Sequence, residues 1–321
     1  MNKNPKKILI NLIFLIIGGF SLFGIRKHID VTKTLETLTT LKIDIVILVV
    51  LATLSAYVLR VFRWMLLLNR HNKNIDFIST FSSLMYGYFV NLGIPRLGEL
   101  TRAVAINKQT KSPFPFVLGT IIMERFVDLL SLGSLLIVYA LFYSDILRLF
   151  FEEKVKSHLM NLLSLSFSLI LISLLLFGII LFLALKKLSS FIRIQISSFV
   201  YGFRSIIHLP NKILFFILTI GIWVSYYFTS YICFFSVEHS YELSFTAGFS
   251  VLILGSIARS IPVQAGAVGV FHTAIISVLT LSFFGVDEQT AFTIALIIHA
   301  IQTLFQLIIG GGSAVYVGLS K

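Results

Sequence analysis

Apolar runs long enough to cross a membrane recur along the chain, with short polar segments between them. Each run is near or above the roughly 20 residues that a helix needs to cross the hydrocarbon core of a bilayer. The pattern therefore predicts six crossing helices. They cover about Ile8–Ile25, Asp44–Leu67, Phe116–Phe142, Leu162–Leu185, Ile213–Phe235 and Thr290–Val317.

Two further apolar stretches are each interrupted by a proline, and they lie at matching places in the two halves of the chain. The first runs from Ser79 to Pro95 and the second from Thr246 to Pro262. Such paired interruptions are typical of transporters built from inverted repeats that bind their substrate near the bilayer midplane. Non-helical backbone is stable at that depth only where protein or a water-filled cavity satisfies its polar groups. We therefore expect a polar site inside the membrane.

The distribution of lysine and arginine predicts how these segments are oriented. Basic residues precede the first predicted crossing and flank the first interrupted stretch, whereas both flanks of the second interrupted stretch lack lysine and arginine. Residues 79–110 and 246–284 are therefore expected to enter the membrane from opposite faces and to return without crossing it. Both chain termini are expected in the cytoplasm.

The predicted fold is an all-α polytopic membrane protein with about six crossings and two re-entrant hairpins in an inverted-topology repeat. The first repeat covers residues 1–143 and the second residues 162–317, within one integral membrane domain. Eight full spans are the alternative. Between the repeats, residues 186–212 contain basic residues and no acidic one, and apolar residues recur there at helical spacing. We expect a cytoplasmic connector with a short interfacial helix, or else a solvated loop.

Composition supports this class and excludes others. Hydrophobic residues make up 57% of the 321 residues and charged residues 12%, against about 25% charged in soluble domains. The single cysteine, Cys233, excludes a disulfide framework and a cysteine metal cluster. The net charge of +12 comes from basic residues that flank apolar runs, so anionic lipid headgroups explain it better than nucleic acid. Motifs for nucleotide, zinc and serine-hydrolase sites are absent from the sequence, so we expect no metal, no cofactor and no ATP-driven pumping by this chain alone.

Charged residues inside an apolar run cost about 2.5–3.5 kcal/mol each near a helix centre and are therefore candidates for function. The third predicted crossing contains Glu124, Arg125 and Asp128. On a helix, Glu124 and Asp128 share one face, and Arg125 can pair with Asp128. The alternative is a self-neutralising triad that only fixes helix packing, because buried ion pairs need not be functional.

The first interruption contains a second polar cluster, formed by Asn91, Arg96, Glu99 and Arg102. If a helix restarts near Leu97, its N-terminal amides and dipole favour an anion at that point. The guanidinium groups of Arg96 and Arg102 suit the oxygens of a phosphate. Glu99 lies three residues from each arginine, so a row of salt bridges at the cytoplasmic surface is the alternative.

The second interruption contains Arg259, the only charged residue of its predicted hairpin and the strongest candidate for a functional arginine. It is followed by Pro262 and by a run with Gly266 and Gly269, where the backbone can approach a ligand or another helix closely. His272 is a candidate for proton transfer or, more simply, a packing residue.

Arg60 and Arg63 lie at helical spacing near the end of the second predicted crossing, with Trp64 beside them. One interpretation is that these side chains are interfacial anchors, with aliphatic stems in the apolar layer and charged ends in water. The other interpretation is that they attract the headgroup of a lipid.

Four segments resemble one family in their order and context: RVFRW at residues 60–64, NLGIPRLGELTRA at 91–103, ERFVDLL at 124–130 and SIPVQAGAVGVFH at 260–272. They are similar to segments of the flippase-like membrane domain of lysylphosphatidylglycerol synthases, which also occurs as a stand-alone protein in bacteria and archaea. The resemblance covers nearly the whole chain. It implies an inner-membrane protein that moves a phospholipid or a related lipid between leaflets.

In two-domain members of that family, a cytoplasmic aminoacyl-transferase domain makes the lipid and the membrane domain flips it. This sequence shows no such domain up to Lys321, so the resemblance is not expected to extend to lysyl transfer. The family's second interruption usually reads P-G-G-x-G-x-x-E. The matching positions here are Ala265, Gly266, Ala267, Gly269 and His272. This departure bears on the substrate more than on the fold.

The sequence therefore predicts a flippase-like transporter of a phospholipid or related anionic or aminoacylated lipid in the cytoplasmic membrane. The alternatives are an intramembrane enzyme acting on lipid-linked substrates and a non-transporting scaffold with a lipid synthase as its partner. The predicted partners otherwise are membrane phospholipids with anionic headgroups. The residues expected to contact the substrate are Arg60, Arg63, Asn91, Arg96, Glu99, Arg102, Glu124, Arg125, Asp128, Arg259, Pro262, Gly266, Gly269 and His272.

Overall fold

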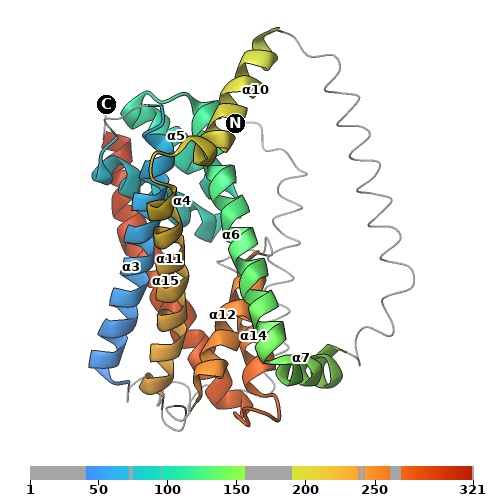
Figure 1. The fold of residues 1–321 in the computed structure, drawn as a ribbon. Helices are drawn as coiled ribbons and strands as arrows, with labels where there is room; N and C mark the ends of the chain where they lie inside the picture. The colour runs from blue at the N-terminus through green and yellow to red at the C-terminus, as the bar shows by residue number, and fades with distance from the viewer. Residues whose placement is uncertain are drawn as a thin grey trace, which may run out of the picture.

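The computed structural model describes residues 41–71, 75–94, 96–155, 190–237, 240, 243–260 and 269–319. Every regular element in these ranges is helical (Figure 1). Four long helices confirm four of the predicted crossings, with ends within two residues of those expected. They are α3 (Ile43–Leu68), α6 (Phe114–Phe142), α11 (Lys212–Cys233) and α15 (Glu288–Leu319). The crossings predicted over residues 8–25 and 162–185 lie outside the described residues.

The long helices have the length and surface of membrane-spanning segments. α3, α15 and α11 with its 3-10 extension η3 (Phe234–Ser236) are each apolar enough to cross a membrane. α6 meets the same test together with α7 (Ser144–Phe150) and the π-helical η1 (Phe151–Val155), across a bend of 101°. The outer faces carry exposed apolar side chains such as Leu51, Leu129 and Ile308, as expected for surfaces that face lipid. The chain is therefore a multi-pass membrane protein.

The first interrupted stretch forms two helices, α4 (Phe77–Gly93) and α5 (Leu97–Thr110). The chain turns between them at Arg96, whose φ of 66° lies in the left-handed region. The two helices then pack unusually closely, because a Cβ on Gly98 would collide with the carbonyl oxygen of Gly87. Only glycine permits backbones to approach so closely.

The second interrupted stretch contains α12 (Phe245–Ser260) and α14 (Val270–Leu279). These helices have 16 and 10 residues, and α4 and α5 have 17 and 14. Each is shorter than the roughly 20 residues needed to cross the hydrocarbon core. Their lengths favour two hairpins over eight full spans. Residues 261–268, which include Pro262 and Gly266, lie outside the described part of the chain.

The two hairpins lie toward opposite ends of the bundle (Figure 1). α4 and α5 pack with α3 and α6 around an apolar core that includes Trp64 and Phe116. α12 and α14 pack with α15 and with the ends of α6 and α11 around a second core that includes Phe271. The interrupted ends meet, because Arg96 Nη2 donates a hydrogen bond to the carbonyl oxygen of Ser260. This arrangement agrees with hairpins that enter from opposite faces.

The segment between the predicted repeats contains α10 (Ser190–Phe203), which continues into the 3-10 helix η2 (Arg204–His208). α10 crosses α6 at close range: a Cβ on Gly119 would collide with the carbonyl oxygen of Phe199, and one on Gly202 with that of Phe116. α10 is therefore fixed against α6 near the end of the bundle that also holds α5 (Figure 1). Its interfacial position in the membrane and the repeat boundaries stay predictions.

Replacing Gly98 by alanine is expected to destabilise the first hairpin, because the added methyl group would collide with the carbonyl oxygen of Gly87. Overpacking of this kind typically costs about 1–3 kcal/mol of the free energy of unfolding. Thermal unfolding of the purified protein in detergent measures the effect. Gly133→Ala is the matched control, since no described residue lies within 4 Å of its added Cβ. Equal unfolding temperatures for the two variants would contradict the close packing of α4 and α5.

Candidate functional site

A network of charged side chains lies where α3, α5 and α6 meet. Arg60 and Arg63 lie three residues apart on one face of α3, and both bind Asp128 of α6. Arg60 Nη1 donates to Asp128 Oδ2 at 2.8 Å, and Arg63 Nη2 donates to Oδ1 at 2.7 Å. The two arginines are only 4% and 0% exposed. Their interpretation as interfacial anchors is therefore wrong, because their charged ends are buried in ion pairs instead of reaching water.

Glu124 is the second carboxylate of the network and is fully buried. It lies one helical turn from Asp128 and forms ion pairs with Arg63, at 3.5 Å, and with Arg102 of α5. The guanidinium of Arg102 lies 3.9 Å from the ring centre of Trp64, a cation–π contact that is strongest when the cation is desolvated. One buried carboxylate thus ties the first hairpin to both α3 and α6.

Arg125 and Glu99 form the outer edge of the network. The Arg125 side chain is 38% exposed, and its carboxylate partners are Asp128 at 3.8 Å and Glu99 at 4.0 Å. The predicted pairing of Arg125 with Asp128 is confirmed, but the triad on α6 is not self-contained, since its other partners come from α3 and α5. Within the described residues, Glu99 pairs with Arg125 and not with Arg96 or Arg102. The predicted row of salt bridges on α5 is therefore wrong.

The charges of the network do not cancel. It contains four guanidinium groups and three carboxylates, which leaves one excess positive charge. Several buried donors have no hydrogen-bond partner in the described part of the chain: the Nε atoms of Arg60, Arg63 and Arg102, and Nη1 of Arg102. Buried polar atoms nearly always have a partner, and arginine donors match the oxygens of phosphate and carboxylate. Two buried carboxylate oxygens, Glu124 Oε1 and Glu99 Oε2, also have no hydrogen-bond partner among the described residues. The network can therefore receive ordered water, and its unpaired guanidinium donors can receive an anion.

Two neutral side chains of α11 also bind the arginines of the network. They were not predicted from the sequence. The hydroxyl oxygen of Tyr226 accepts a hydrogen bond from Arg60 Nη2 at 3.1 Å, and Thr219 Oγ1 accepts one from Arg63 Nη1 at 3.3 Å. They are seven residues apart, so they lie on one face two turns apart. Polar residues at that spacing inside an apolar run are the signal that could have identified them.

The turn of the first hairpin offers fewer free donors than expected. α5 begins at Leu97, as predicted. However, Asn91 Oδ1 accepts a hydrogen bond from the backbone N–H of Gly98 at 2.7 Å, so one of the amides at this helix start already has a partner. Arg96 is exposed and reaches Ser260 of the second hairpin. The side chain of Arg96 therefore connects the two hairpins in this structure.

On the second hairpin, Arg259 has no acidic partner among the described residues. Its guanidinium donates hydrogen bonds to the side-chain oxygen of Gln302 on α15 and, at 3.3 Å, to the carbonyl oxygen of Gly255. It also lies 4.7 Å from the ring centre of Phe271. Gln302 lies one turn before Gln306 on α15, and Gln306 donates a hydrogen bond to the hydroxyl oxygen of Tyr57, three residues before Arg60 on α3. These polar groups therefore connect the buried network with the arginine of the second hairpin.

Of the remaining predicted residues of the second hairpin, Gly269 and His272 lie in the described part of the chain, and neither forms a hydrogen bond or ion pair with the network there. His272 packs against His299, with ring centres 5.1 Å apart, and the two are 2% and 8% exposed. This favours the packing interpretation of His272. Gly269 immediately precedes α14 with a φ of 88°, which favours glycine. Among the described residues, no group of three histidine, cysteine, aspartate or glutamate side chains is placed to hold a metal ion.

The fold and the site define a class of protein: an all-helical, multi-pass membrane protein with two interrupted helical hairpins and a buried arginine–carboxylate network. Residues 8–310 match the family described as the lysylphosphatidylglycerol synthase TM region, and the chain belongs to that family. It is also similar to a UPF0104 membrane protein of Methanocaldococcus jannaschii, with 27% identity over 237 residues, or 71% of this chain and 94% of the relative. No solved structure matches the chain.

Replacing Glu124 by glutamine is expected to destabilise the protein strongly, because the buried Arg102 loses its one carboxylate partner among the described residues and Arg63 loses one of its two. Breaking one partner out of a buried ion pair costs about 3–5 kcal/mol. Thermal unfolding in detergent measures the loss. Glu152→Gln is the control, since among the described residues Glu152 pairs only with the exposed Arg148, and exposed pairs contribute about 0–1 kcal/mol. If both variants shifted the unfolding temperature equally, the network would not hold the helices together.

Proposed function

We propose that this chain moves a phospholipid, or a related anionic or aminoacylated lipid, between the leaflets of the cytoplasmic membrane of a bacterium or archaeon. The observation that carries the proposal is the excess positive charge of a buried network whose edge, at Arg125, opens beside lipid-facing side chains. All lipids of this group share a phosphate, and the planar guanidinium of arginine suits phosphate oxygens. Membership of the family supports a lipid-related role in the membrane.

The surroundings of Arg125 suit an amphiphilic substrate. Ile122 and Leu129 lie on the same face of α6, three residues before and four residues after Arg125, and they are 41% and 65% exposed. A phosphate can contact the guanidinium while the acyl chains stay against these apolar side chains. The competing pair of Arg125 with Glu99 is long, at 4.0 Å, and partly exposed, so a phosphate replaces Glu99 at small cost.

From the network, polar side chains continue toward the second hairpin. The hydroxyl group of Tyr226 binds Arg60, the ring of Tyr88 lies 5.3 Å from that of Tyr57, and the hydroxyl of Tyr57 binds Gln306, one turn from the Gln302 that binds Arg259. In the proposed function, the headgroup passes along these hydroxyl groups from the network to Arg259. Because Arg259 has no acidic partner among the described residues, it is the second place where a phosphate would find an available positive charge.

Removing the Arg125 side chain is expected to slow lipid movement. Arg125→Ala should lower the initial rate of phosphatidylglycerol movement about tenfold, the effect of losing about 1.4 kcal/mol of interaction. The measurement is the loss of fluorescence of a headgroup-labelled phosphatidylglycerol in proteoliposomes when a membrane-impermeant reductant is added. Arg148→Ala is the matched control, because Arg148 is also an ion-paired arginine but lies 77% exposed on α7.

The same assay separates this function from the two alternatives. Wild-type proteoliposomes that move lipid no faster than protein-free liposomes would refute the transport proposal. Formation of a new lipid species, detected by mass spectrometry, would favour an intramembrane enzyme. A scaffold would show neither activity, and substitutions of its buried charges would matter only through expression.

Arg259 provides an independent test at the other hairpin. Arg259→Ala should slow lipid movement by a similar factor without the large loss of stability expected at Glu124, because Arg259 forms no ion pair among the described residues. Transport rates and unfolding temperatures measured on the same preparations check both statements. Arg259→Lys keeps the charge and should retain more activity than alanine. Full activity of the well-folded alanine variant would remove Arg259 from the proposed path.

A further inference from the structure

Arg259 is a positive charge that has only neutral partners among the described residues. Its guanidinium donates hydrogen bonds to the side-chain oxygen of Gln302 and to the carbonyl oxygen of Gly255, and it lies 4.7 Å from the ring centre of Phe271. Each arginine of the network at α3, α5 and α6, by contrast, has at least one carboxylate partner. The charge of Arg259 is therefore not compensated by any described residue.

The helices around Arg259 carry almost no acidic residues. From residue 243 to residue 321 the sequence contains only Asp287 and Glu288. Both precede Gln302 by at least 14 residues, or roughly 21 Å along the axis of α15. A carboxylate at that distance cannot form an ion pair with the guanidinium that Gln302 binds.

Gln302 occupies the one position where a longer-range partner is not needed and a carboxylate would fit. It is 8% exposed and lies near the middle of the 32-residue α15. A polar side chain at such a depth is costly unless it has a hydrogen-bond partner, and Arg259 is that partner. Glutamate has the shape of glutamine and would reach the same guanidinium, but it would cancel the charge. The neutral side chain of Gln302 thus holds Arg259 in place and leaves its charge for a ligand.

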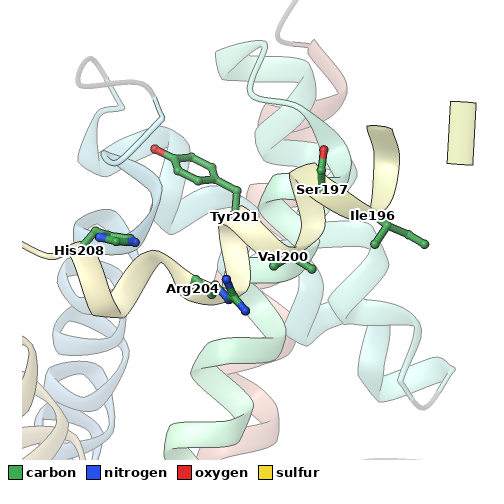
Figure 2. A pocket seen from close by; sticks show the side chains of 6 residues that line it. All are labelled: Ile196, Ser197, Val200, Tyr201, Arg204 and His208. Atoms are coloured by element: carbon green, nitrogen blue, oxygen red, sulfur yellow. The ribbon is translucent and has the colours of Figure 1, made fainter. Parts of the chain in front are cut away.

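The guanidinium of Arg259 also lies where several elements meet. Arg259, Phe271 and Gln302 come from α12, α14 and α15. Arg259 is only partly buried, and most of its N–H groups form no hydrogen bond with the described residues. The groove along α10 and η2 is different, because the six side chains that line it all belong to one helical segment (Figure 2). A ligand in that groove would be held from one side only, whereas Arg259 can hold a ligand within the bundle.

We propose that Gln302 is a positioning residue that makes the site at Arg259 selective for headgroups with one net negative charge. The proposal rests on the proposed function for its substrate, a phospholipid, and narrows that substrate to lipids such as phosphatidylglycerol. Their phosphodiester offsets the charge of Arg259. Phosphatidylcholine brings a second cation with its phosphate, and no described carboxylate beside Arg259 compensates that cation.

The test is equilibrium binding of short-chain lipids to the purified protein in a non-ionic detergent, measured by the rise of the unfolding temperature with lipid concentration. All proteins carry Arg125→Ala, which removes the other arginine proposed to bind a phosphate. This parent protein should bind dihexanoyl-phosphatidylglycerol about tenfold more tightly than dihexanoyl-phosphatidylcholine, the factor expected from one hydrogen bond to a charged group. Gln302→Glu should abolish the preference without lowering the unfolding temperature of the lipid-free protein, because the new carboxylate pairs with Arg259.

Three further variants separate the charge from other effects. Gln289→Glu makes the same change in the first turn of the same helix, 13 residues before Gln302, and should leave the preference unchanged. Gln302→Leu removes the hydrogen bond to Arg259 but keeps the positive charge, so it should retain the preference. Arg259→Gln removes the charge and should abolish the preference, and combining it with Gln302→Glu should cause no further loss.

The possible outcomes are distinct. A preference that survives Gln302→Glu or Arg259→Gln overturns the proposal. So does an equal loss in Gln302→Leu, which would mean that the hydrogen bond matters and not the neutrality, or in Gln289→Glu, which would mean an effect of diffuse charge. Arg259→Gln adds no carboxylate and decides the question if Gln302→Glu does not fold.

Binding is measured without transport, so this proposal and the proposed function fail separately. A protein that prefers phosphatidylglycerol in this assay but does not move it in proteoliposomes would support the selective site and refute lipid movement. A protein that moves lipid but shows no preference would refute the selective site alone.

Discussion

The two carboxylates that α6 carries into the bundle, Glu124 and Asp128, determine how the first half of this protein is assembled. Three buried guanidinium groups, two from α3 and one from the first hairpin, would be prohibitively costly in an apolar interior without them. Each carboxylate binds two of these groups. Ion pairs with fixed geometry therefore set the register of α3 against α6 and the position of α5. The outer surfaces of these helices offer lipid only non-specific apolar contact.

In this arrangement the arginines fall into two groups, one with a structural role and one available to a ligand. Arg60, Arg63 and Arg102 are enclosed and ion-paired with Glu124 and Asp128, so they hold helices in place. Arg125, on α6, has only long ion pairs of 3.8 and 4.0 Å, and Arg259, on the second hairpin, has no ion pair among the described residues. A headgroup that enters this interior would contact Arg125 or Arg259 before it contacts the three enclosed arginines. The same division explains why removing a carboxylate and removing one of the outer arginines should have different consequences for folding and for function.

Much of the fold could be predicted from the sequence because apolar run length and helix length are tied to one physical quantity, the thickness of the bilayer. The bounds of α3, α6, α11 and α15 follow from it, and the proline at position 95 marks the break between α4 and α5. The pairing of charges could be predicted only within one helix, as for Arg125 and Asp128. The pair of Arg60 with Asp128 joins residues 68 positions apart, and no spacing rule reaches that far. Tyr226 escaped notice because a single aromatic residue in an apolar run carries no signal, and only its spacing of seven residues from Thr219 marks it as polar.

The bend of 101° after α6 has a consequence for where these charges lie in the bilayer. Since α6 crosses the membrane, α7 runs nearly parallel to its surface, and its exposed Arg148 and Glu152 belong in water. The position of α7 at the membrane surface therefore indicates how deep each residue of α6 lies in the bilayer. Arg125 lies 18 residues before Tyr143, or roughly 27 Å along the helix axis, whereas the hydrocarbon layer is about 30 Å thick. The edge of the arginine network therefore lies close to the boundary of the opposite leaflet, within reach of its headgroups, and the residues of α6 on which α10 rests lie beyond that boundary.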